Sequence, residues 1–296
     1  MFRTWASLAL ALLGFGAATS ASASAVQPPT WTQPIKPFRI APHLYYVGTK
    51  GLSAYLITSQ AGAILIDGTL NQNAALVEHN IETVGVPLTT VKWLLSDHAH
   101  SDHVGALAQI KMDTGARFAA SAGDQAALES GAPRGDTDYD QTDFHFPPIK
   151  VDRVIEDGQS VIVGDAVLTA HLTPGHTPGC TSWSTTVNDG RRRLSVLFLC
   201  SLTVAGNRLV GNRAYPTIAD DYEATFAKLS TTKADIVLTS HPEIADVLGR
   251  EARVRAGDRR AFIDPDALSE IVIQSKQDFE AALADQNAAS RVEPQR

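Results

Sequence analysis

The sequence contains very little cysteine, since Cys180 and Cys200 are the only two among 296 residues. Neither lies in a Cys-x-x-Cys pair, which argues against a zinc site built on cysteine. Dense positive charge is also scarce: the only such run, at 191–193, follows a turn sequence at 188–190. With 25 Lys and Arg against 32 Asp and Glu, the surface repels phosphate backbones. We therefore expect no nucleic-acid substrate.

The chain also lacks an apolar run long enough to cross a bilayer comfortably, because the N-terminal run covers only residues 6–18. Arg3 precedes this run, and small-x-small sequences at 21–23 and 23–25 follow it. This order is typical of a secretory signal peptide. We predict that residues 1–25 are such a peptide. The mature protein would begin near Val26 and act in the periplasm or outside the cell, without membrane attachment.

Apolar sequence is plentiful, at 44% of residues, which is ample for the core of a single catalytic domain spanning 26–296. Short β-rich runs predict strands at 43–47, 54–58 and 63–66, and helical spacing predicts a helix at 71–84. A strand at 91–95 leads into the polar sequence 96–103. A helix at 105–114, a strand at 117–120 and a short helix at 124–130 follow. The segment 131–148 has no clean period and is predicted to be a mobile loop.

A similar succession follows, with strands and turns at 153–202, a helix at 222–229, a strand at 236–239 and a long helix at 265–287. Strands followed by helices, twice over, predict an α/β fold of two similar halves, packed sheet to sheet with helices outside. The turn at 188–190 predicts a hairpin that brings Cys180 and Cys200 close together. In an oxidising compartment these two either form a disulfide or remain two buried thiols.

The strongest chemical signal is His98-x-His100-x-Asp102-His103, four good zinc ligands within six residues. Side chains two apart in an extended segment point the same way, so we expect His98 and His100 to reach one ion together. Asp102 and His103, where the chain turns into the next helix, would face a second ion. Zinc accepts imidazole nitrogen and carboxylate oxygen, and a catalytic site keeps one position for water.

Two further histidines follow later strands. His176 lies in the Pro/Gly-rich loop 173–179, and His241 directly follows the strand at 236–239. We assign both as ligands, which completes a set of six for two Zn²⁺ per chain. His171, in the strand that leads to His176, serves packing or supports a ligand. The histidines predicted not to bind metal are His43, His79, His145 and His171.

Two zinc ions that share one solvent molecule would give a coherent hydrolytic mechanism. Each ion lowers the pKa of the solvent, so hydroxide is available near neutral pH without a separate base. One ion would polarise the scissile carbonyl and the other would stabilise the leaving nitrogen. We therefore expect a hydrolase that acts on a small molecule, and we expect it to be a monomer.

The motif resembles that of the metallo-β-lactamase superfamily, His-x-His-x-Asp-His on a loop between sheet and helix. The resemblance extends from Phe38 to His241. In particular, the sequence at 65–68 is similar to the strand end whose aspartate, here Asp67, supports the metal loop. The resemblance implies an αββα sandwich with the metals at one edge of the two sheets.

Many members of that superfamily have an aspartate on the strand after the third histidine, and it bridges the two metals. This sequence has Ser201 there, between Cys200 and Leu202, and a serine does not bridge two zinc ions as a carboxylate does. The difference resembles the third subclass of class B metallo-β-lactamases. It implies two groups of three ligands: His98, His100 and His176 for the first zinc, and Asp102, His103 and His241 for the second.

The same resemblance implies roles for residues beside the metals. Ser201 and Thr203 would bind the carboxylate of the substrate, and Asn207 falls where some members have a tyrosine that assists the oxyanion. We assign catalytic roles to Asp102, Ser201 and Asn207. Asp97 stands where a small hydroxyl or amide residue is common. It either adds negative charge near the first metal or points to solvent.

The resemblance implies a function as well. It predicts a di-zinc hydrolase that opens the β-lactam ring of penicillins, cephalosporins and carbapenems by attack of a zinc-bound hydroxide, giving antibiotic resistance. The alternative is a secreted lactonase, or another ester or thioester hydrolase of the same superfamily. Ser201 in place of a bridging aspartate argues against this alternative.

Overall fold

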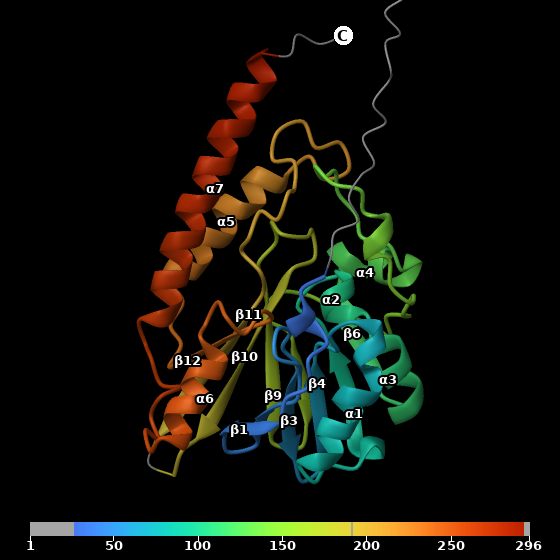
Figure 1. Ribbon diagram of the computed structural model, residues 1–296, viewed down its shortest axis with the longest axis vertical. Helices are drawn as coiled ribbons and strands as arrows, with labels where there is room; N and C mark the ends of the chain where they lie inside the picture. Colours follow the sequence, from blue (N-terminus) through green and yellow to red (C-terminus); the bar gives the residue numbers. More distant parts are fainter. Residues whose placement is uncertain (1–26, 191, 293–296) are drawn as a thin grey trace, which may run out of the picture.

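The computed structural model of the chain describes residues 27–190 and 192–292. These residues form two β-sheets that lie between two groups of helices (Figure 1). This is the αββα arrangement predicted from the sequence. The predicted signal peptide, residues 1–25, lies outside the described residues.

The first sheet has seven strands that pair in chain order. They are β1 (Phe38–Ala41), β2 (Leu44–Tyr46), β3 (Tyr55–Ser59), β4 (Gly62–Ile66), β5 (Val91–Leu95), β6 (Arg117–Ser121) and β7 (Arg153–Ile155). Strands β1 to β4 pair antiparallel, and β4 to β7 pair in parallel. The parallel strands β4 to β6 therefore end at the same edge of the sheet.

The second sheet has five strands, β8 (Ser160–Val163), β9 (Ala166–Leu172), β10 (Thr181–Asn188), β11 (Arg193–Leu199) and β12 (Ile236–Thr239). Their order is β12-β11-β10-β9-β8. Neighbours pair antiparallel except β11 and β12, which are parallel. The predicted hairpin is β10 and β11, and it places the two cysteines just outside its open end.

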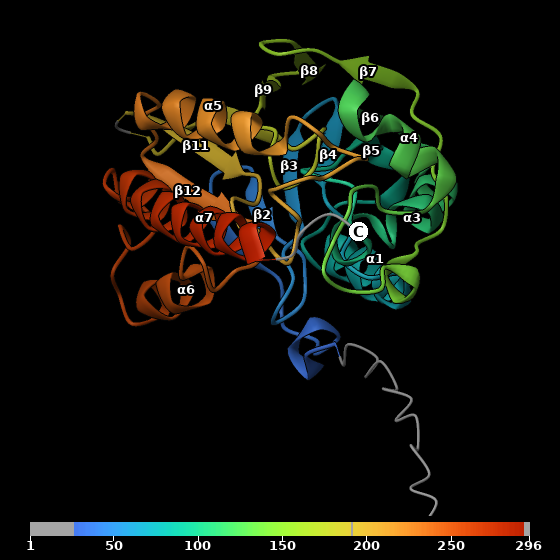
Figure 2. The same cartoon turned by 90° about the horizontal axis from the view of Figure 1, so that it is seen from above.

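The helices divide between the two halves of the chain. The first half has α1 (Ala74–Thr83), α2 (Ser101–Val104), α3 (Leu107–Thr114) and α4 (Ala122–Ser130), and the second has α5 (Ile218–Ser230), α6 (Val247–Arg255) and α7 (Ala267–Val292). Short 3₁₀ helices lie at Pro29–Trp31, Asn71–Asn73, Leu88–Thr90 and Thr142–Phe144. Seen from above, the two helical groups lie on opposite sides of the strands (Figure 2). None of the helices described is both long and apolar enough to cross a membrane.

Alternation along the strands builds three apolar layers, because successive side chains of a strand point to opposite faces. Ile64 and Ile66 of β4 join the core between the two sheets, whereas Leu65 packs under α1 and α3. In β11, Phe198 faces the first sheet, whereas Leu197 packs under α5 and α7. The central strands of both sheets are thus covered on both faces, whereas Ile162 of β8 and Val167 of β9 are exposed.

Candidate metal centre

The six predicted ligands gather in two groups of three. The four ligands from His98 to His103 lie on the loop after β5 and in α2, which belong to the first half. His176 follows β9 and His241 follows β12, in the second half. Each group therefore takes ligands from both halves of the molecule.

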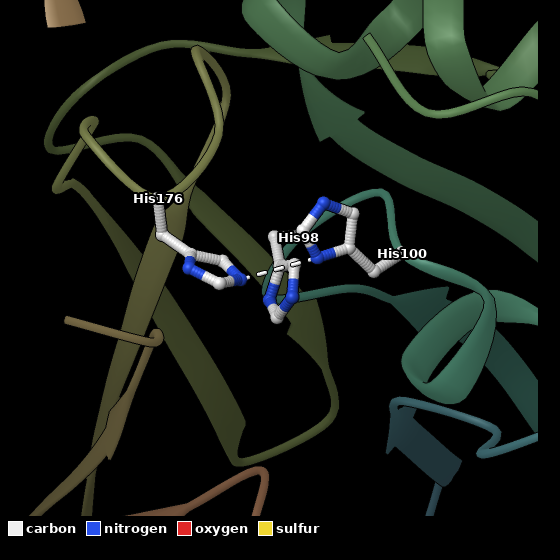
Figure 3. Close-up of side chains that lie close together, drawn as sticks. All are labelled: His98, His100 and His176. Atoms are coloured by element: carbon white, nitrogen blue, oxygen red, sulfur yellow. Dashed lines mark hydrogen bonds between the residues drawn. The ribbon is translucent and has the colours of Figure 1, made fainter. Parts of the chain in front are cut away.

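His98, His100 and His176 form the first group, and their rings converge from two separate loops (Figure 3). One nitrogen of each ring lies within 4.8 Å of the other two, and His176 Nε2 is 3.1 Å from His100 Nδ1. His98 Nε2 is buried without a hydrogen-bond partner. A buried polar nitrogen without a partner is costly. The arrangement fits a cation held by three nitrogens.

Asp102, His103 and His241 form the second group. Asp102 Oδ2 lies 3.2 Å from His103 Nε2 and 3.3 Å from His241 Nε2. The two groups adjoin, because the rings of His98 and His103 have centroids only 4.3 Å apart. Two imidazoles and one carboxylate are donors that zinc accepts, so the residues present fit two zinc ions.

The histidines of the first group are neutral at pH 7 before any metal binds. Burial lowers the pKa of His98 to about 4. Burial and the neighbouring imidazoles lower the pKa values of His100 and His176 to about 3. A metal ion can therefore bind these neutral rings without a net release of protons.

The second group is charged before metal binds. Burial by itself would raise the pKa of Asp102, but His103 holds it well below the usual value. Burial by itself would lower the pKa of His103, but Asp102 and Asp97 raise it to about 10. His103 therefore carries a proton at neutral pH, and a metal ion must displace that proton in order to bind.

Contacts on the outer side of His176 select which of its nitrogens faces the first group. Nδ1 donates a hydrogen bond of 2.7 Å to the carbonyl of Thr203, which leaves Nε2 as the ligand atom. The hydroxyl of Tyr222 donates to the same carbonyl at 2.6 Å. The side-chain nitrogen of Asn207 donates to the backbone carbonyl of His176 at 3.0 Å. Two of these bonds hold His176 directly, and the Tyr222 bond holds the Thr203 carbonyl that fixes its ring.

A cavity of about 310 Å³ opens over the two groups, and all six ligands line it. Ser201 and Thr203 lie on its wall, with their hydroxyl oxygens 3.0 Å apart, and their role in binding the substrate stays a prediction. Asn207 is not among the residues that line the cavity, because its amide is directed to the His176 carbonyl. Its role at the oxyanion stays a prediction.

A family model described as the metallo-β-lactamase superfamily matches residues 48–241, which is more than half of the chain and includes all six ligands. The chain belongs to the metallo-β-lactamase superfamily. Among curated proteins it matches a probable metallo-hydrolase from Burkholderia pseudomallei, with 28% identity over 143 residues. The match covers 46% of this chain and 48% of that relative, so the chain spans about half the length of the curated protein it matches.

Solved metallo-β-lactamases resemble this chain over nearly their whole length. BJP-1 of Bradyrhizobium japonicum, a subclass B3 enzyme, has 43% identity and a TM-score of 0.84, covering 88% of this chain and 98% of its own. A metallo-β-lactamase with a HARLDQ motif from Cronobacter sakazakii has 37% identity and a TM-score of 0.82, covering 87% and 98%. FEZ-1 from Legionella gormanii has 34% identity and a TM-score of 0.82, covering 86% and 98%.

Several residues of the site were not singled out from the sequence. Trp31, Tyr139 and Phe144 line the cavity, and the ring of Trp31 lies 5.6 Å from that of His241. Tyr139 and Phe144 belong to the segment 131–148, which was predicted only to be a mobile loop. Its aromatic content was the one signal that could have marked it as a cavity wall.

Asp124 was missed as well. Its carboxylate accepts hydrogen bonds from the backbone N–H groups of Ala99 and Gly179, each at 2.9 Å, and from the hydroxyl of Thr177 at 3.0 Å. It therefore ties the loop of the first two ligands to the loop of His176. A single aspartate at the start of a short helix gives no sequence signal of this role.

The two alternatives left open for the cysteines and for Asp97 are decided by the structure. Cys180 and Cys200 form a disulfide, and the sulfur of Cys200 lies 3.9 Å from His98 Nδ1. Asp97 is only 3% exposed and lies against His98, so it does not point to solvent. His171 bonds to the hydroxyl of Ser184 and belongs to no described group of metal-binding side chains.

Proposed function

We propose that the protein is a zinc-dependent β-lactamase that opens the ring of penicillins, cephalosporins and carbapenems and so gives antibiotic resistance. The observation that carries the proposal is the ligand set. Two groups of three ligands lie side by side without a carboxylate at Ser201, whose hydroxyl pairs with Thr203 instead. The similarity to BJP-1 and FEZ-1 supports the same substrate class.

In this proposal His98, His100 and His176 hold one zinc ion, and Asp102, His103 and His241 hold the other. Zinc bound there supplies an activated water and polarises the carbonyl under attack. The protein's own contribution is orientation. The Thr203 carbonyl fixes the His176 ring, and Asp124 fixes the two loops relative to each other.

The cavity walls suit a small, carboxylate-bearing amide. In this proposal the hydroxyls of Ser201 and Thr203, on the wall of the cavity, donate hydrogen bonds to a substrate carboxylate. The aromatic wall of Trp31, Tyr139 and Phe144 would cover apolar substituents and exclude water from the reacting bond.

The proposal places the mature protein in the periplasm or outside the cell, as a monomer, after removal of residues 1–25. The disulfide between Cys180 and Cys200 supports the proposed location, because disulfides form and persist in oxidising compartments.

The test is a substrate panel on purified protein that lacks residues 1–25. We expect it to open a carbapenem, to lose this activity with a chelator and to recover it with zinc. The Ser201→Ala variant should bind β-lactams more weakly while retaining its metal. Failure to open any β-lactam, together with rapid hydrolysis of lactones or thioesters, would assign the protein to the alternative class.

A further inference from the structure

Asp97 directly precedes the first ligand, and its carboxylate is buried against that ligand's ring. Its Oδ1 accepts a hydrogen bond of 2.6 Å from the backbone N–H of His98 and lies 3.0 Å from Nδ1 of the same side chain. A carboxylate at this distance favours a proton on Nδ1, which leaves the lone pair on Nε2. Nε2 is the buried His98 nitrogen that has no hydrogen-bond partner and belongs to the first metal group.

The backbone of Asp97 is held by both halves of the molecule. Its N–H donates a hydrogen bond of 2.9 Å to Oδ1 of Asp67, which follows β4. Its carbonyl accepts a hydrogen bond of 2.8 Å from Thr181, the first residue of β10. The residue is therefore fixed where the two sheets meet, and its side chain keeps its position against His98.

The same carboxylate also lies near the second metal group. One potential ligand atom from each of Asp67, Asp97 and His103 lies within 4.8 Å of the other two. Asp97 Oδ2 and His103 Nδ1 are both buried without a hydrogen-bond partner. A buried carboxylate oxygen without a partner is costly unless positive charge lies close by. Cations held by His98 and His103 would supply this charge.

We propose that Asp97 is a positioning residue that orients His98 toward the first metal ion and, with the same charge, strengthens both metal groups. It does not touch the substrate, because it does not line the cavity. The inference rests on the proposed two-metal site and deepens it. It assigns the affinity for metal partly to a carboxylate outside the six ligands.

A merely structural role for Asp97 predicts a different outcome. In the metal-free protein, Asp97 lies near a second buried carboxylate, Asp67, and near His103. Removing the charge of Asp97 should weaken metal binding, because both metal groups lose a nearby negative charge. If Asp97 only supported the backbone, its loss would destabilise the metal-free protein and leave the affinity for metal unchanged.

The experiment compares zinc affinity, measured by competition with a chromophoric chelator, in the wild type, Asp97→Asn and Asp97→Ala. We expect Asp97→Ala to bind the zinc of the first group about 10- to 100-fold more weakly. Asp97→Asn keeps an oxygen beside His98 without the charge, so it should fall between the wild type and Asp97→Ala. The denaturant midpoint of each metal-free variant is measured as well, so that a loss of fold is distinguished from a loss of zinc affinity.

Nuclear magnetic resonance can follow the proton on His98 Nδ1 directly. In the cobalt-substituted wild type, the Nδ1–H of His98 should give a shifted resonance that exchanges slowly with solvent. In Asp97→Ala that resonance should exchange much faster, because the carboxylate that holds the proton is gone.

Asp124→Ala is the matched control, because Asp124 is a buried carboxylate that supports the same loop without contacting a ligand ring. It should lower the metal-free midpoint and leave the exchange of the His98 proton unchanged. Equal zinc affinity in the wild type and Asp97→Ala would overturn the inference, as would an unchanged exchange rate of the His98 proton. Asp97-dependent zinc binding without β-lactam hydrolysis would overturn the proposed function alone, and a wild type that binds no zinc would overturn both.

Discussion

Among the histidines of this chain, the setting of each ring decides what it can do. His176 and His171 lie five positions apart in sequence, and burial lowers the pKa of both, but they differ in exposure and in their hydrogen-bond partners. His176 is buried, has a lowered pKa and has one nitrogen fixed by the Thr203 carbonyl. His171 is half-buried and bonds to a serine hydroxyl on its own sheet. Burial and a single outer hydrogen bond make an imidazole available to a metal.

Replacing His176 by Ala should remove the first metal ion and nearly all turnover. Only two imidazoles, His98 and His100, would remain in that group, and zinc sites rarely hold with two protein ligands. Metal content by atomic emission and turnover of a carbapenem measure the effect. Full activity in this variant would show that the ligand assignment is wrong.

His176 should also make the stability of the metal-free protein depend on pH. Its folded pKa of about 3 lies below the unfolded value of 6.5. The folded state thus resists a proton that the unfolded state accepts, so stability present above pH 6.5 is lost as the pH falls toward 3. Relative to His176→Asn, the wild type should lose up to about 1.4 kcal/mol per pH unit in this window. Denaturant unfolding at several pH values, with metal removed, measures the difference, and a constant difference would contradict it.

At the scale of elements, helices remote from the site hold one of its ligands. Phe279 of α7 packs on Tyr222 of α5 with ring centroids 5.0 Å apart, and the Tyr222 hydroxyl donates to the carbonyl that fixes His176. Contacts therefore run without a break from helix α7 to Tyr222 of α5, then to the Thr203 carbonyl, and finally to the His176 ring. The C-terminal helix is thereby connected to the first metal group.

The Tyr222→Phe variant should lose about 1 kcal/mol of unfolding free energy, because it removes one buried hydrogen bond and keeps the ring. It should also lower the affinity for the first metal ion several-fold, since the Thr203 carbonyl is less firmly held. Tyr215→Phe is the control, because the buried Tyr215 hydroxyl has no hydrogen-bond partner among the described residues. An equal loss in both variants would rule out the specific role of Tyr222.

The disulfide joins the start of β10 to the end of β11 and closes a loop between residues 20 apart. Replacing both cysteines by serine should cost about 3 kcal/mol of unfolding free energy, because the unfolded chain gains freedom. Denaturant unfolding with and without a reductant measures this. The wild type should lose stability with the reductant, and the double variant should be indifferent to it.

Elements with a clear apolar pattern were predictable, and others were not. Strands β5 and β12 have the predicted bounds, because both are short apolar runs that end in polar residues. Helix α6 was missed because Val247 is its only fully buried residue, so it has almost no apolar period. Backbone hydrogen bonds join residues 136–138 to residues 206–208. They depend on tertiary contact between two loops, so no sequence pattern predicts them.

The candidate site was predictable because four of its six predicted ligands lie close together in the sequence, at positions 98–103. All six ligands converge as predicted, because a motif of four fixed the chemistry and two histidines followed strands. Asn207 shows where such reasoning ends. The side a loop residue faces depends on its local backbone, and here Ala205 and Gly206, just before it, both have positive φ. No sequence pattern fixed that turn, nor the placement of Trp31.

At the scale of the whole molecule, the two halves meet in the metal site. His98, His100, Asp102 and His103 come from the half with the seven-stranded sheet, and His176 and His241 come from the other. Neither half supplies three ligands of one group by itself. We therefore expect metal binding to stabilise the docking of the two halves as well as the site.

Zinc should raise the unfolding free energy in steps that match its occupancy. At a free concentration 100 times the dissociation constant, one site contributes about 2.7 kcal/mol if the unfolded chain does not bind. A chelator should lower Tm, and added zinc should restore it. His176→Ala should show one step fewer than the wild type, and a Tm that does not respond to zinc would argue against a metal centre shared by the halves.

The division of the ligands between the two halves has a consequence for the lifetime of the protein. Where zinc is scarce, the seam between the halves opens more often, and proteases reach chain that is otherwise enclosed. We expect the protein to be degraded faster in zinc-starved cells, so that its abundance follows the supply of metal.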